Sequence, residues 1–389
     1  MFLFILISIF LTCFLIELIH KYRMNSPLIL KPKKFKKYIL DSKIKYIVLV
    51  EVINIHKKME VMIPFFKVNP QLIGISKNEL ISIKTNIKPQ HPDEEAQKND
   101  YWSAYILKSK MSTFINIEIE FELKKLSRNK FKCIWLDIEW DNYGPFGFFT
   151  RYDGFVLPNY SNQAKVINNT SNTSLLEPIK THILGSLDDP INILKSYLPQ
   201  DYLPNDILTI GESPLAIMQG KYIDFRTINI SPLAKILCKG FHPTSSLATA
   251  CGMQTLINIS GPTRVIISWL AGGISKCLGI RGLFYRLAGE QARLIDDITG
   301  TTPPYDKSIV LGPKDTKAFC IKASLELQVN VAVVDVNDLG RVKVLSTNDT
   351  NNSNIIKKAL TSNPAGNANQ HTPLVLIRQN KINTRSHNS

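Results

Sequence analysis

Strict alternation of apolar and polar side chains over residues 115–123 is the feature that most constrains the fold. The segment reads Ile-Asn-Ile-Glu-Ile-Glu-Phe-Glu-Leu. Side chains of a strand point alternately to the two faces of a sheet, so this pattern predicts a strand with one buried and one wet face. Further strands are predicted over residues 45–55 and 132–141. We therefore expect a β-rich domain over residues 41–158.

The amino-terminal residues 2–19 are apolar apart from Ser8, Thr12 and Glu17. As a helix these residues would span about 27 Å, close to the thickness of a bilayer's hydrocarbon core. No basic residue precedes the segment and no small-residue cleavage site follows it, which disfavours a signal peptide. We predict a single transmembrane anchor over residues 1–20. Because basic residues follow it, the bulk of the chain should lie on the cytoplasmic side.

Residues 21–40 are rich in lysine and are predicted to be a basic juxtamembrane linker that lies against anionic lipid headgroups. The net charge is +15, but the bias towards Lys, Ile and Asn runs along the whole chain. No nucleic-acid-binding motif is present, so no nucleic-acid partner is expected. The six cysteines form no Cys-x-x-Cys pair and are predicted to be free thiols.

The second half of the chain begins after an Asn/Ser/Thr-rich stretch, residues 159–174, which is predicted to be a linker. Strands and helices then mix without a regular βαβ alternation over residues 175–380, which indicates an α+β fold. Residues 381–389 are polar and are predicted to be a disordered tail.

Acids, arginines and hydroxyl residues gather between residues 240 and 345. In a helix predicted over residues 285–298, Arg286, Glu290, Arg293 and Asp297 would share one face. Such a face is either an exposed row of ion pairs or part of a binding site. Carboxylates hold hard cations and guanidinium groups neutralise phosphate, so the residue types suit a site for a nucleotide and a divalent metal.

An apolar strand from Val331 ends in Asp335, and Asp338 follows shortly. Acids at the carboxyl end of a strand are a frequent ligand position in α/β sheets, although Asp also favours turns. Ser245 and Ser246 follow Pro243 and predict a helix start whose free N–H groups face an anion.

Residues 206–378 resemble the coenzyme F-420-0:γ-glutamyl ligase family. Residues 206–224 resemble the family's segment that ends in Glu-Gly-Arg, with Lys221 at the Arg position. Residues 297–313 resemble the stretch Gly-Ile-Asp-x-Ser-Asn that leads to Leu-Leu-Pro. Residues 331–341 resemble the strand ending Asp-Thr-x-Gly-Arg, and residues 372–378 resemble the closing strand Pro-x-Val-Val-Val-Arg.

The resemblance implies an α+β homodimer without a P-loop. Such an enzyme uses GTP and Mg²⁺ or Mn²⁺ to add L-glutamate to a deazaflavin acceptor. The family's metal-binding aspartates lie in the second and third matching segments. They leave two pairs of candidates for the metal, Asp297 or Asp306 and Asp335 or Asp338. The candidates for the nucleotide phosphates are Arg286, Arg293, Thr299, Thr301, Thr302, Lys221, Ser245 and Ser246. No catalytic residue is identified.

The chain also departs from the family. Ser213, Ala216 and Ile217 stand where the family has Lys, Ser and Lys, and the segment between Arg341 and Pro373 is shorter. The hypothesis is a membrane-anchored, GTP- and metal-dependent amide-bond ligase with a small-molecule acceptor. The alternative is an inactive binding or scaffold protein that retains the ligase fold.

Overall fold

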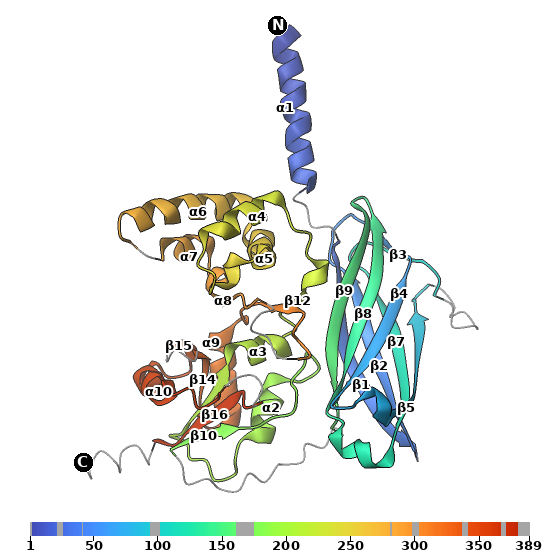
Figure 1. Cartoon of the computed structure of the whole chain (residues 1–389), viewed down its shortest axis with the longest axis vertical. Coiled ribbons are helices and arrows are strands. Elements are labelled where there is room, and N and C mark those ends of the chain that lie inside the picture. The colour runs from blue at the N-terminus through green and yellow to red at the C-terminus, as the bar shows by residue number, and fades with distance from the viewer. Residues whose placement is uncertain are drawn as a thin grey trace.

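The computed structural model describes residues 2–21, 26–40, 42–93, 102–160, 175–280, 282–297, 303–336, 341–366 and 371–379 (Figure 1). It contains a β-sandwich, an α+β region and a layer of short helices, and helix α1 (Phe2–Lys21) projects at the amino-terminal end. The predicted linker over residues 159–174 lies almost wholly outside the described residues. The predicted tail, residues 381–389, lies wholly outside them.

Two antiparallel sheets form the sandwich. The first sheet has the order β1 (Leu28–Leu40), β2 (Lys43–Asn54), β7 (Ser112–Leu123) and β5 (Leu80–Gln90). The second has the order β4 (Phe66–Ile73), β8 (Cys133–Gly144), β3 (Val61–Ile63) and β6 (Tyr105–Leu107), with β9 (Gly147–Pro158) also paired to β8. Burial alternates along the whole of β7, and its buried side chains share a core with Trp140. The β-rich domain is thus confirmed.

The basic segment predicted as a linker is instead strand β1 from Leu28 onwards. β1 pairs with β2 along its length at one edge of the first sheet. Phe35 stacks on the buried Tyr46 with ring centroids 6.1 Å apart, and Lys33 forms a 2.6 Å ion pair with Glu51 of β2. Charged side chains suit an edge strand because they oppose pairing with another chain. The sandwich therefore starts before residue 41.

The amino-terminal segment is helical, as expected. Among the residues that the structure describes, no helix combines the length and apolar character that a membrane span requires. The predicted transmembrane anchor is not confirmed.

The α+β region is built on a mixed sheet, which confirms the predicted fold class of this part. Its order is β10 (Leu176–Ile179), β16 (Leu374–Ile377), β11 (Ile207–Gly211), β14 (Asn330–Val336) and β15 (Val342–Thr347). Strands β11 and β14 are parallel and the other pairs are antiparallel. Helices α2 (Pro190–Tyr197) and α9 (Thr316–Leu327) share a core with one face of the sheet. Helix α10 (Ser353–Leu360) packs on the other face.

A layer of short helices is inserted between strands β12 (Tyr222–Asp224) and β13 (Ser308–Val310), which pair with each other. Its helices are α4 (Pro232–Leu237), α5 (Ala250–Ser260), α6 (Pro262–Cys277), α7 (Leu283–Ala288) and α8 (Gln291–Leu294). Leu256, Val265 and Phe284 belong to a core of its own.

The prediction of a single helix over residues 285–298 is wrong. Helix α7 ends at Ala288, Gly289 has a φ of 106°, and α8 begins only at Gln291. A glycine with positive φ ends a helix at little steric cost. Arg286 and Arg293 therefore lie on different helices and do not share one face.

The β8–β9 hairpin forms the junction between the sandwich and the rest of the chain. Trp135 and Val156 of the hairpin share a small core with Tyr305, and the rings of Trp135 and Tyr305 are 5.3 Å apart. Tyr222 of β12 donates a 2.8 Å hydrogen bond to the carbonyl of Gly154. The junction is a packed interface, which holds strand β12 against the sandwich.

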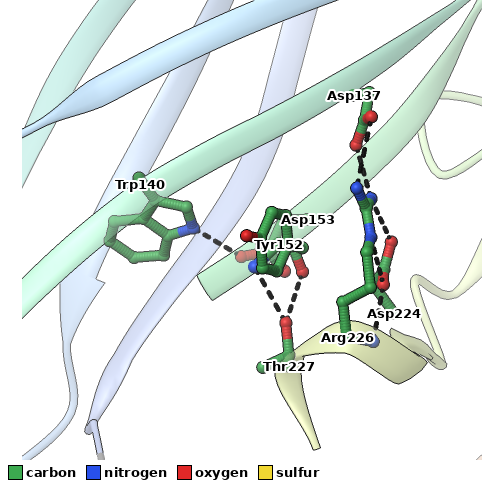
Figure 2. Close-up of polar contacts among 7 residues, drawn as sticks. All are labelled: Asp137, Trp140, Tyr152, Asp153, Asp224, Arg226 and Thr227. Carbon is green, nitrogen blue, oxygen red and sulfur yellow. Dashed lines mark hydrogen bonds and ion pairs between the residues drawn. The ribbon is translucent and has the colours of Figure 1, made fainter. Parts of the chain in front are cut away.

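Arg226 is the central polar residue of this junction (Figure 2). Its Nη2 lies 2.7 Å from Asp137 Oδ1 of β8 and 2.6 Å from Asp224 Oδ2 of β12. Its guanidinium lies 4.3 Å above the ring of Tyr152. Thr227 donates to the Tyr152 carbonyl and accepts from the Tyr152 N–H, both at 2.8 Å. One cation thus neutralises two nearly buried carboxylates from different parts of the chain.

Arg226→Ala should lower the free energy of unfolding by about 3 kcal/mol, because Asp137 and Asp224 would be left buried without their counter-charge. Urea unfolding measures this change. Arg293→Ala, at an exposed position on α8, is the control and should have no measurable effect. Equal stability of the two variants would show that the ion pair does not support the junction.

Gly154→Ala should destabilise the protein by about 2 kcal/mol through overpacking. A Cβ at this position would lie 2.3 Å from Cζ2 of Trp135 and 2.8 Å from the Leu136 carbonyl oxygen. Gly273→Ala on α6 is the matched control, since a Cβ there meets nothing within 4 Å. The difference in melting temperature between the two variants is the measurement, and the prediction fails if Gly154→Ala melts at or above the control.

Candidate functional site

A cavity of about 590 Å³ lies at the carboxyl ends of the parallel strands β11 and β14. Gly211 at the end of β11, Glu212 directly after it and Asp335 near the end of β14 line the cavity. Ligands commonly bind at this edge of α/β sheets. Tyr305 also lines the cavity, so the residue that packs against Trp135 of the sandwich is part of the wall.

Three carboxylates from separate elements line this cavity: Glu212, Asp296 and Asp335. The pKa of Glu212 is raised to about 8, chiefly by burial and then by the charges of Asp335 and Asp296, which the charge of Lys343 partly offsets. Burial also raises the pKa of Asp296, and the charge of Asp335 adds to this, although the Ser213 hydroxyl donates a 2.7 Å hydrogen bond to Asp296 Oδ2. The carboxylates are therefore close enough to repel one another, which favours a proton or a cation in the cavity.

Two histidines also line the cavity. His182 is fixed on both sides, with Nδ1 2.6 Å from the Tyr197 hydroxyl and Nε2 3.2 Å from Asp188 Oδ2. The pKa of His371 is lowered by burial and then by the charges of Lys132 and Lys180. His371 is therefore largely neutral at pH 7 and is able to accept a proton.

Only one of the predicted metal ligands that the structure describes reaches the cavity. Asp335 lines it, whereas the exposed Asp306 does not. Asp297 is only 3% exposed and lies near Cys251, the pKa of whose thiol is raised by burial and then by the charge of Asp297. Asp338 lies outside the described residues.

Asp296 takes the place predicted for Asp297. Its backbone pairs with Val310 through N–H···O bonds of 2.8 and 2.9 Å. Consecutive side chains of an extended segment point in opposite directions, so Asp296 faces the cavity and Asp297 does not. The sequence pattern does not single out Glu212, although Glu212 directly follows strand β11 and Asp335 lies near the end of strand β14. Nothing in the sequence pattern points to His371.

None of the predicted phosphate ligands that the structure describes lines the cavity. Arg286 and Arg293 are exposed on the helical layer. Lys221 is half-buried, and its pKa is lowered by burial and by the charge of Lys314. Ser245 caps the turn that contains Ser246. Thr299, Thr301 and Thr302 lie outside the described residues. The cavity-lining residues include no Lys or Arg in the part of the chain that is described.

Residues 29–161, about a third of the chain, match the sequence model of the F420-0:gamma-glutamyl ligase N-terminal Ig-like domain. This match supports the resemblance to the ligase family. The resemblance itself is based on other segments of the chain, within residues 206–378. A comparison with curated proteins finds no match.

Solved structures align with about a third of the chain at low similarity. The GAE domain of GGA2p from Saccharomyces cerevisiae is 12% identical and covers 34% of this chain and 92% of its own, with a TM-score of 0.21. A FixG-related protein from Vibrio parahaemolyticus is 6% identical and covers 34% of this chain and 96% of its own, with a TM-score of 0.18. At such TM-scores nothing follows for this chain.

Glu212→Gln should flatten the pH dependence of stability. The pKa of Glu212 rises from 4.5 to about 8 on folding, so the folded protein binds the extra proton between these values. The stability of the unaltered protein therefore falls as pH rises through this window, by up to about 5 kcal/mol. Urea unfolding below pH 4.5 and above pH 8 measures the slope. Glu326→Gln, at an exposed position, is the control and should keep the full decline in stability with rising pH. The same full decline in Glu212→Gln would contradict the prediction.

Proposed function

We propose that this chain is a γ-glutamyl-ligase-like enzyme that joins an amine to an activated carboxylate in this cavity. It would use GTP or a related nucleotide with Mg²⁺ or Mn²⁺. The observation that carries the proposal is the group of Glu212, Asp296 and Asp335 at the carboxyl ends of two parallel strands. The match of the sandwich to the Ig-like domain of the ligase family supports it.

The carboxylate oxygens of this group are chemically suited to bind a hard divalent cation. Within the described ranges, no three His, Cys, Asp or Glu side chains are grouped closely enough to hold a metal alone. Mg²⁺ usually takes one or two carboxylates and completes its shell with water and phosphate oxygens. Asp296 and Asp335 would be the two carboxylates here. When bound, the metal would neutralise phosphate charge.

The chain's own residues have separate roles in this proposal. Glu212 has a pKa of about 8 before a metal binds, so at neutral pH it is then mostly protonated and is able to donate a hydrogen bond to an anionic substrate. His371 would accept a proton from the attacking ammonium group, which must be neutral to act as a nucleophile. The wall formed by Ile183, Leu184 and Tyr305 would keep water from the activated carboxylate.

One observation favours the alternative of an inactive binding or scaffold protein. The described lining contains no Lys or Arg, so little fixed positive charge faces a triphosphate. Lys132 and Lys180 lie near enough to affect the pKa of His371 and offer some compensation. A scaffold would bind a nucleotide or another small ligand without turnover. Release of phosphate in the presence of glutamate and a deazaflavin acceptor distinguishes the two.

Asp296→Asn and Asp335→Asn should each abolish metal-dependent stabilisation by nucleotide. The measurement is the thermal shift of the full chain with GTP, ATP or GDP, each with and without Mn²⁺. Asp306→Asn is the control and should bind as the unaltered protein does, because Asp306 is exposed and outside the cavity. If only Asp306→Asn lost the metal-dependent thermal shift, the metal site would lie outside the cavity. No shift in any variant or in the unaltered protein would contradict nucleotide binding.

A further inference from the structure

The sequence of the helical layer has an unusual charge distribution. Between Asp224 and Glu290 it contains no Asp or Glu at all, whereas six basic residues lie between Ser231 and Gly289. The five of these that the structure describes are all exposed, and none forms an ion pair with any described residue. They are Lys235, Lys239, Arg264, Lys276 and Arg286.

Helix α6 carries an exposed apolar face within this basic layer. Ile267, Leu270 and Ile274 are 60%, 53% and 65% exposed, and their spacing of three and four residues places them on one side of the helix. Leu278 and Ile280, just beyond the helix, are 72% and 53% exposed and continue the apolar surface. Contiguous exposed apolar surface usually marks a binding site.

The opposite side of α6 anchors it in the protein. Val265, Ser268 and Ser275 are buried, and Trp269 donates a 3.1 Å hydrogen bond to the Leu237 carbonyl of α4. The apolar face of α6 is therefore the outer surface of a packed helix. In Figure 1, α6 and α4 lie at the end of the molecule from which α1 projects, away from the sheet of the α+β region.

We propose that this face of α6, together with exposed basic residues of the same layer, docks on the surface of an anionic lipid bilayer. An exposed apolar stripe on a helix of a cationic region is suited to lie in the plane of the interface, with its apolar side chains among the acyl chains. The lysines and arginines would face anionic headgroups, which supply the counter-charge that residues 225–289 lack. The inference is independent of the proposed function because none of these residues lines the cavity.

Vesicle co-sedimentation of the full chain tests the proposal. Vesicles of phosphatidylcholine with phosphatidylglycerol should bind the protein, and added salt should weaken this binding. Ile267→Asn with Ile274→Asn should reduce the partition coefficient by about tenfold or more. Ile321→Asn with Leu325→Asn on α9 is the matched control, since these residues are 43% and 76% exposed. All variants retain α1, so any binding through α1 is common to them.

A second pair of variants tests whether the basic residues contribute to vesicle binding. Lys239→Glu with Lys276→Glu should weaken binding to the anionic vesicles, whereas Lys357→Glu with Lys358→Glu on α10 should not. Equal binding by the α6 variants and their controls would overturn the proposal. So would a loss of self-association in size-exclusion chromatography without a change in vesicle binding, because the face would then be covered by a second copy of the chain.

A fluorophore on Cys277 provides a readout that does not depend on these variants. Cys277 is exposed at the end of α6, and the accessible Cys13 and half-buried Cys251 would be replaced by Ser. The emission of an environment-sensitive label should shift to the blue on anionic vesicles if α6 enters the interface. An unchanged spectrum with vesicle-bound protein would show that another surface makes the contact.

Discussion

The arrangement of the molecule depends on one cation between two carboxylates. Arg226 joins Asp137 of the sandwich to Asp224 of strand β12, and without it two nearly buried negative charges would face each other across the junction. Strand β12 in turn pairs with β13, and Tyr305 shortly before β13 forms part of the cavity wall. The electrostatics of the junction and the shape of the cavity are therefore linked through a short length of chain.

Charge is distributed unevenly over the protein, and this unevenness separates two kinds of surface. The cavity gathers carboxylates from three elements and raises the pKa of Glu212 to about 8, so it is prepared for a proton or a cation. Residues 225–289 of the helical layer contain no Asp or Glu and present exposed cations and an exposed apolar face of helix α6. The net charge of +15 conceals this difference, because it sums two regions that attract partners of opposite sign.

Local patterns in the sequence predict the strands and the fold class, whereas the site depends on details that patterns do not contain. Alternation over residues 115–123 correctly predicts β7, but the lysines of β1 hide an edge strand because edge strands tolerate charge on both faces. Gly289 interrupts the expected helix, and the sequence alone does not show whether a single glycine adopts a positive φ. Asp296 and Asp297 are equivalent in sequence, and only the backbone pairing with Val310 decides which of them faces the cavity. The carboxyl-end rule that predicts Asp335 applies equally to Glu212.

The tight contact at Gly154 has a consequence for how such a protein can evolve. Trp135 and the Leu136 carbonyl leave no room for a Cβ there, and Tyr222 of the second region binds the Gly154 carbonyl. A domain held in this way is not an exchangeable module on a flexible tether. Recombination that replaced the Ig-like domain would have to carry over Tyr222, Arg226 and Tyr305 as well, so the two regions are expected to be inherited as one unit.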